Sequence, residues 1–254
     1  MSPFTRLALA ATLVACVATA HAAPVTGQGT WETTLQARDI SGNAVASNAP
    51  SAAFFYDTTL NVTWLANMNA NGRMNWGGAM AWAGALTTGG FTDWRLPTVI
   101  DSGSPGCDFS FAGGTDCGNN VQTQVGSAYS EWAHLYYLTL GNLGFCNPAT
   151  SRISACTEQT GWGLSNTAYF QNMQSFFYWS GTVYVSPGSG DVWYFRNLDG
   201  LQHYTRTSAG FYAVAVRSGD VLRVTGTVPE PQSLALALTA LAGLGVALRR
   251  RRAT

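Results

Sequence analysis

The 254-residue sequence contains no lysine, and only 10% of its residues are charged. Ordinary globular proteins carry about 25% charged residues, so this glycine- and aromatic-rich composition is typical of an extracellular protein. All 13 basic residues are arginines, of which one lies near the N-terminus and four form a cluster near the C-terminus. The body between them keeps eight arginines against twelve carboxylates, a net charge near −4. Because nucleic-acid binding depends on concentrated positive charge, we expect no nucleic-acid partner.

Residue patterns of known catalytic sites are also absent. The sequence has three histidines, His21, His134 and His203, and none stands in a metal-ligand spacing such as H-E-x-x-H. No G-x-S-x-G nucleophile motif occurs. The twelve carboxylates would allow many pairs for glycoside hydrolysis, but the sequence specifies none of them. We therefore predict no catalytic residue and no enzymatic activity, with an extracellular hydrolase as the less favoured alternative, and we expect His134 to be half-buried on a helix.

The N-terminus has the pattern of a secretory signal peptide. Arg6 precedes a largely apolar run, residues 7–18, and small residues then lead to a cleavage position between Ala22 and Ala23. Residues 1–22 are therefore predicted to direct export through the Sec translocon, with removal by signal peptidase. An alternative stays open, because residues 13–16 also resemble a lipobox that would place a lipid on Cys16.

The C-terminus, residues 228–252, has three consecutive parts: a proline-rich motif, the apolar stretch 233–248 and an arginine cluster. At about 1.5 Å per residue, the apolar stretch makes a helix of roughly 24 Å, slightly short of a hydrocarbon core of about 30 Å. The arginines would keep the end of the chain in the cytoplasm and leave the proline motif on the outer side. The motif consists of Val228, Pro229, Glu230 and Pro231, and the cluster of Arg249, Arg250, Arg251 and Arg252.

This tripartite arrangement resembles the PEP-CTERM sorting signal of Gram-negative bacteria. The resemblance implies recognition by an exosortase, cleavage near residues 229–231, and release or attachment at the cell surface or in an exopolysaccharide matrix. Contact with the membrane would then be limited to the transient C-terminal helix. A permanent single-pass anchor is the alternative.

Four cysteines remain in the body, and an oxidising compartment favours disulfides. Three connectivities are possible. The identical spacings Cys107-x9-Cys117 and Cys146-x9-Cys156 favour two local bridges, Cys107–Cys117 and Cys146–Cys156. A four-cysteine zinc site is the rival, but it lacks the short C-x2-C spacing of zinc ligands.

The pattern of apolar residues and turn signals predicts one α+β domain with two main helices and antiparallel strands. Asn75 is a predicted N-cap for a helix over residues 76–86, and Ser127 or Ser130 for a second helix that contains Glu131. Strands are predicted at the following positions: residues 30–40, 54–56, 61–65, 175–184, 192–195 and 211–217. A hairpin turn is expected between the second and third of these.

Several motifs resemble the Lcl C-terminal domain family, named after a collagen-like bacterial adhesin. The most specific are Trp-Arg-Leu-Pro-Thr at residues 94–98 and Tyr-Trp-Ser at residues 178–180. The resemblance covers residues 54–220, preceded by an N-terminal strand and linker, 23–53, and followed by a linker, 221–227. It implies a fold distantly similar to C-type-lectin-like domains, and sulfated-glycan binding in the adhesin members. Because the body of this chain is acidic and contains no lysine, we do not extend sulfated-glycan binding to it.

The signature residues are predicted to be structural: Asp57, Trp64, Trp76, Asp93, Trp94, Arg95, Leu96, Pro97, Tyr178, Trp179, Ser180 and Arg217. Trp94, Trp179 and Trp193 are expected in the core, and Arg95 beside a carboxylate or backbone carbonyls. The candidate glycan contacts are Trp162, Tyr184 and Tyr204, aromatics near turns. No cofactor is predicted, although oxygen-bearing side chains around the first cysteine loop leave calcium open: Asp101, Asp108, Asp116, Asn119 and Asn120.

Together these features predict an exported, non-enzymatic protein of the cell surface or extracellular matrix that binds polysaccharide. A purely structural matrix protein is the alternative.

Overall fold

The computed structural model describes residues 23–101, 116–121, 123–124, 127–128, 130–151, 155–186 and 188–223. The chain divides at Val221 into two compact units. Only residues 222–223 of the second unit are described, so the fold below is that of the first. The predicted signal peptide, sorting signal and Cys107 lie outside the described residues. Within those residues, no helix has the length and apolar character needed to cross a membrane.

The first sheet has four antiparallel strands in the order β1-β2-β3-β9. The strands are β1 (Leu35–Asp39), β2 (Ala52–Asp57), β3 (Val62–Leu65) and β9 (Val216–Ser218). The predicted hairpin is confirmed, because β2 and β3 pair from Asp57↔Val62 onwards. The Asp57 carboxylate accepts hydrogen bonds from the amides of Thr59 and Leu60 and so closes the turn between them.

The predicted strand 30–40 is wrong in its first half. Residues Trp31–Thr34 form a single helical turn, α1, and β1 begins only at Leu35. The carbonyl of Thr30 accepts from the amides of Thr33 and Thr34, and the turn brings Trp31 into the core at 6% exposure. Burial of this indole, a tertiary effect, outweighs the local strand propensity.

The second sheet has three antiparallel strands, β6 (Phe177–Val183), β7 (Asp191–Arg196) and β8 (Leu201–Arg206), and a small hairpin joins β4 (Thr123–Gln124) to β5 (Ser127–Ala128). The predicted strands 175–184 and 192–195 are confirmed. Strand β8 was not predicted, because its polar residues gave no β-branched run. The predicted strand 211–217 is largely irregular: besides β9, it forms only single bridges, such as Met74↔Phe211.

Both main helices begin where a side chain caps them. In α2 (Trp76–Gly84), the Asn75 side chain accepts from the Gly78 amide at 2.8 Å, as predicted. In α3 (Glu131–Ala133) the cap is Ser130, since Ser127 belongs to β5. A π-helix, η2 (His134–Thr139), continues α3, and a short 3-10 helix, η1 (Thr88–Gly90), follows α2. The α+β class and the existence of both helices are thus confirmed.

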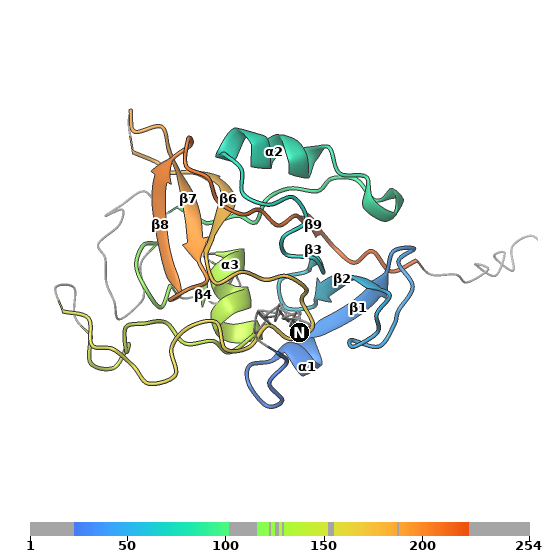
Figure 1. Cartoon of the computed structure of the whole chain (residues 1–254), viewed down its shortest axis with the longest axis horizontal. Coiled ribbons are helices and arrows are strands. Elements are labelled where there is room, and N and C mark those ends of the chain that lie inside the picture. Colours follow the sequence, from blue (N-terminus) through green and yellow to red (C-terminus); the bar gives the residue numbers. More distant parts are fainter. Residues whose placement is uncertain are drawn as a thin grey trace, which may run out of the picture. The chain divides into compact units, whose positions relative to one another are not determined.

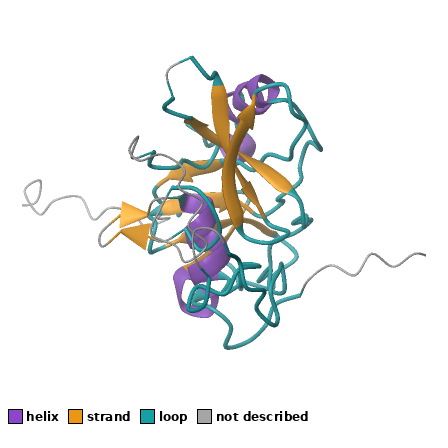
Figure 2. Cartoon of the chain, turned by 90° about the vertical axis from the view of Figure 1, so that its left-hand side faces the viewer, coloured by secondary structure: helices purple, strands orange, loops and turns teal. Residues whose placement is uncertain are grey.

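Trp132 of α3 joins the two sheets through one aromatic cluster. Its ring lies 5.6 Å from that of Trp64 in β3, 4.7 Å from Tyr178 in β6 and 6.2 Å from Phe195 in β7, measured between centroids. All four side chains are at most 2% exposed. Figure 1 shows α3 between the sheet that carries β1, β2 and β3 and the sheet of β6, β7 and β8. In Figure 2 the strands occupy the middle of the unit, and long loops run around them.

A buried polar group lies at the edge of this core. The Asp57 carboxylate accepts a 3.1 Å hydrogen bond from the Thr139 hydroxyl, and both residues have 0% exposure. His134, expected to be half-buried, is buried at 6% exposure, because η2 packs this side of the helix inward. Its Nδ1 has no hydrogen-bond partner within the described residues. Burial lowers the pKa of His134 below its ordinary value, while the Asp57 charge acts in the opposite direction.

Substitution of Trp132 tests the importance of the cluster. Trp132→Ala is expected to lower the free energy of unfolding by about 3–5 kcal/mol, because it leaves a cavity between the two sheets. Trp162→Ala, at a half-buried loop position, should cost clearly less. Urea unfolding followed by fluorescence measures both, and equal losses would contradict the central role of Trp132.

The buried imidazole predicts a pH-dependent stability. Since the pKa of His134 is lower in the folded than in the unfolded state, the unfolded chain binds the proton more readily. The free energy of unfolding should be highest above about pH 6.5, the unfolded value, and fall as the pH drops below it. His134→Leu should flatten this dependence between pH 7.5 and 5.5 in urea titrations. Identical pH profiles for the two proteins would contradict the assignment.

Candidate functional site

Most of the signature residues lie inside the fold. Trp94, Leu96, Tyr178, Trp179 and Ser180 are at most 3% exposed. Pro97 is also buried, and its carbonyl accepts from the Gly181 amide. The indole N–H of Trp76 donates to the carbonyl of Ser180 at 2.9 Å. The burial predicted for Trp94, Trp179 and Trp193 is confirmed, since they are 0–3% exposed. These residues join the chain segments to one another and leave no surface for a ligand.

Arg95 has the carboxylate partner that the sequence suggested. Its guanidinium forms a bidentate pair with Glu131, two hydrogen bonds of 2.7 Å, and also donates to the Leu96 carbonyl. Glu131 in turn accepts from the Thr98 amide at 2.7 Å. Hydrogen bonding to Glu131 raises the pKa of Arg95. The pair therefore fixes the segment 95–98 against α3.

The two remaining charged signature residues are more exposed. Asp93 has a positive φ of 63° and is exposed, with only a 3.5 Å contact from the Thr92 hydroxyl. The guanidinium of Arg217 lies 5.6 Å from the centroid of the Phe91 ring, and its Nε donates to the Thr92 carbonyl. They lie at the edge of the first sheet.

Two of the three candidate glycan contacts come together. Tyr184 and Tyr204 stack face to face, with centroids 3.9 Å apart and planes 3° apart, and both rings meet the edge of Trp193. Desolvation, and then the neighbouring Tyr204, raise the pKa of Tyr184. Because each ring covers one face of the other, the pair offers less stacking surface than two separate tyrosines.

The third candidate, Trp162, lies apart from this pair on the loop after the Cys146–Cys156 bridge. Its indole N–H donates to Glu158 at 2.8 Å, and its ring meets Phe145 edge-on at 5.0 Å. The three residues therefore do not form one site.

A groove that the sequence did not reveal opens beside α2. It has a volume of about 360 Å³, within the usual range for small-molecule sites. One wall is formed by Trp82 and Leu86, and the opposite wall by the start of β2 and the end of β3. The lining residues are Pro50, Ser51, Ala52, Ala53, Leu65, Ala66, Asn67, Ala70, Trp82, Leu86, Thr88 and Gln171.

The lining of this groove is uncharged but rich in hydrogen-bonding groups. Trp82 is half-exposed, and its indole N–H makes no hydrogen bond within the described part of the chain. Asn67 is held in place because its side-chain oxygen accepts from the Asn69 amide and from Asn172 Nδ2, both at 3.1 Å. The side-chain NH₂ of Asn67 is left for a ligand. The side chain of Gln171 makes a 3.5 Å contact from its Nε2 to the carbonyl of Ala52.

In the predicted helix 76–86, the apolar residues Ala79, Trp82, Ala83 and Leu86 recur at helical spacing, which is typical of one buried face. Only Ala79 and Ala83 of this face are buried. Trp82 and Leu86 lie at its margin, where they pack against the core with one side and line the groove with the other. The sequence signals for the groove were a tryptophan in the helix and a separate segment, 43–53, of small, polar and proline residues. The sequence does not show that these two segments meet in the fold.

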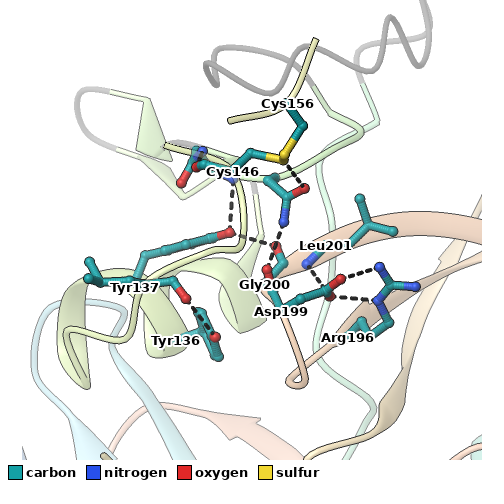
Figure 3. A network of polar contacts seen from close by, with 11 residues as sticks. Tyr136, Tyr137, Cys146, Cys156, Arg196, Asp199, Gly200 and Leu201 are labelled. Carbon is teal, nitrogen blue, oxygen red and sulfur yellow. Dashed lines mark hydrogen bonds and ion pairs between the residues drawn. A yellow bond between two sulfur atoms is a disulfide. The ribbon is translucent and has the colours of Figure 1, made fainter. Parts of the chain in front are cut away.

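Figure 3 shows a network of polar contacts at the turn between β7 and β8, away from the groove lining. The Asp199 carboxylate forms a bidentate pair with Arg196. The Tyr137 hydroxyl donates to the Gly200 carbonyl at 2.6 Å and accepts from the Asn120 amide at 2.9 Å. Gly200 has a φ of +76°, and a Cβ there would collide with the Tyr137 hydroxyl. This network is structural, because every group in it is bonded to another part of the chain.

The Cys146–Cys156 bridge lies beside this turn and is present as predicted. Asn120 Nδ2 donates to the Cys146 carbonyl at 2.7 Å, which ties the bridged loop to the loop before α3. Cys117 is also disulfide-bonded, and its predicted partner, Cys107, lies outside the described residues.

Most described carboxylates are similarly engaged in hydrogen bonds that hold the fold. These are Glu32, Asp39, Asp57, Asp101, Glu131, Glu158, Asp199 and Asp220. Asp101, a calcium candidate, accepts from the Trp193 indole at 2.9 Å and the Val185 amide at 2.7 Å. Asn119 and Asn120 donate to carbonyls, Asp116 is buried, and Asp108 lies outside the described residues. In the described ranges, no three His, Cys, Asp or Glu side chains form a cluster suited to a metal ion.

Comparisons with known proteins give no relative: no protein-family model, no curated protein and no solved structure matches this chain.

Proposed function

We propose that this protein is an exported, non-enzymatic module that binds polysaccharide in the groove beside α2. The observation that carries the proposal is the composition of that groove: a half-exposed indole, several amide and hydroxyl groups, and no charge. Sugar rings combine an apolar face with many hydroxyl groups. Aromatic stacking together with fixed amide donors and acceptors suits such a ligand, because apolar surface supplies affinity and polar groups supply orientation.

The groove favours binding over a purely structural role in the matrix. A protein selected only for durability needs a packed core and disulfides, but it has no use for a partly exposed tryptophan within a concave, hydrogen-bonding surface. Exposed concave surfaces that combine aromatic and polar groups are typical of ligand sites. The engagement of the carboxylates in structural bonds is the reason for proposing binding without hydrolysis. A distant relation to C-type-lectin-like domains, and to the Lcl C-terminal domain family, is part of the same proposal.

The place of action follows from the two ends of the sequence. The signal peptide, residues 1–22, would direct export by the Sec translocon and signal peptidase. The sorting signal, residues 228–252, would then be cut by an exosortase. The protein would act at the surface or in the extracellular matrix of a Gram-negative bacterium, where exopolysaccharide is available as a ligand.

Substitution in the groove tests the binding proposal. The exported protein should be retarded in native gels that contain exopolysaccharide from the producing strain. Trp82→Ala should weaken this binding about tenfold, because removal of one central aromatic contact costs on the order of 1–2 kcal/mol. Tyr56→Ala is the matched control, the loss of a partly exposed aromatic of β2 outside the groove, and should bind like the wild type. Equal retardation of the Trp82 variant and the wild type would refute the groove as the site.

Processing of the termini is tested separately. The intact mass of the mature protein should correspond to a chain that begins at Ala23 and ends near residues 229–231. Replacement of Pro229 and Glu230 by alanine should leave the protein in the membrane fraction with its tail attached. A diacylglycerol mass on Cys16 would instead support lipidation, and unchanged release of the variant would contradict exosortase cleavage.

A further inference from the structure

A cluster of aromatic rings beside Arg73, here called the aromatic shelf, has no role in the groove. It consists of Phe176, Phe177 and Phe211, all half-buried. The rings of Phe177 and Phe211 stack at 4.8 Å, and Phe176 meets Phe177 edge-on at 4.6 Å. Trp179 also lies against Phe211 at 4.4 Å, and the Arg196 guanidinium lies over the Phe177 ring at 5.7 Å. These contacts cover several ring faces, so the cluster offers a ligand a small apolar surface made largely of ring edges.

Arg73 is fixed over this shelf. Its guanidinium lies 4.8 Å from the centroid of the Phe176 ring, and its Nε donates to the Gly210 carbonyl at 2.9 Å. The next residue, Met74, pairs with Phe211 through two backbone hydrogen bonds of 2.8 and 3.0 Å. These contacts orient the guanidinium before any ligand arrives.

The charge of Arg73 is not neutralised within the described part of the chain. Arg38, Arg95 and Arg196 form ion pairs with carboxylates there, but Arg73 does not. Both terminal nitrogens remain available for an acceptor. A guanidinium recognises a planar carboxylate through two parallel hydrogen bonds, and the neighbouring rings exclude water on one side, which strengthens such a bond.

The shelf is connected to the groove by two chain segments. Asn67 and Ala70 line the groove, and the same loop continues to Arg73; likewise Gln171 lines the groove, and its segment continues to Phe176. Six residues span at most about 22 Å, so Arg73 lies within that distance of Asn67 along the loop. This maximum separation is within the length of an extended oligosaccharide.

We propose that the aromatic shelf and Arg73 form a subsite for a carboxylate-bearing sugar, a uronate unit of an acidic polysaccharide whose neighbouring units occupy the groove. The carboxylate of the uronate pairs with the Arg73 guanidinium, and its ring contacts the partly exposed edges of the phenylalanines. This subsite gives the otherwise acidic body a local attraction for an anionic polymer. The inference rests on the proposed function of the groove, and its chemistry is tested independently of it.

The test compares two polymers that differ only in charge, polygalacturonate and its methyl ester, in titrations of the exported protein. The wild type should bind polygalacturonate about tenfold more tightly than the ester, as expected for a charge-assisted bidentate contact. Arg73→Gln should remove this preference and leave binding of the ester unchanged. Arg206→Gln is the matched control, since it removes an exposed arginine of β8 that is not part of the shelf, and it should preserve the preference.

The possible outcomes separate the two proposals. The subsite is refuted if the Arg73 variant keeps the preference for polygalacturonate, or if the wild type binds neither polymer. The groove is then tested separately, by binding to the exopolysaccharide of the producing strain. Loss of the preference in the Arg73 variant with no effect of Trp82→Ala on either polymer supports the shelf and refutes the groove. Dextran sulfate is the last comparison: if Arg73→Gln weakens its binding as strongly as that of polygalacturonate, recognition is of charge alone and the carboxylate assignment is wrong.

Discussion

The packing of Trp132 between the two sheets is the interaction on which the rest of the structure depends. Neither sheet has a large hydrophobic face of its own, since one has four short strands and the other three. The short helix α3 places one large ring against Trp64, Tyr178 and Phe195 and so joins both sheets into one core. The indole N–H groups of Trp64 and Trp132 have no partner within the described residues. Their burial costs free energy that the apolar contact area has to offset.

This use of aromatic side chains decides where ligands are able to bind. Trp64, Trp94 and Trp179 of the signature motifs are buried in the core and cannot contact a ligand. A binding surface therefore has to be built from other residues. Trp82 at the margin of α2 and the phenylalanines near Arg73 meet that condition, because each is only partly buried. Polar side chains also divide into structural groups and groups available to a ligand. The Arg95–Glu131 and Arg196–Asp199 pairs hold chain segments together. Asn67 keeps its side-chain NH₂, and Arg73 its two terminal nitrogens, for a ligand.

Local features of the sequence were sufficient for a substantial part of the fold. The β2–β3 hairpin and the start of α2 were predicted because Asp57 and Asn75 act on their own neighbours, through bonds that span three residues or fewer. The same holds for the Cys146–Cys156 bridge, which closes a short loop. Two failed predictions have different reasons. Burial of Trp31 in the core creates α1. Strand β8 pairs with its neighbour β7 in a hairpin, but its polar residues give no strand pattern in the sequence.

The sequence by itself determined the α+β class, the lysine-free acidic body and the predictions for export and sorting, because these depend on composition and on contiguous motifs. Its candidate glycan contacts stay predictions: Tyr184 and Tyr204 meet, but they cover each other. The groove was decided only by the tertiary structure. Its walls come from segments around residues 50–53, 65–70, 82–88 and 171, and no local pattern encodes which of these meet. Trp82 stands at the same helical spacing as a core residue would, so the sequence pattern alone does not show that it lines the groove. Only the packing of α2 decides this.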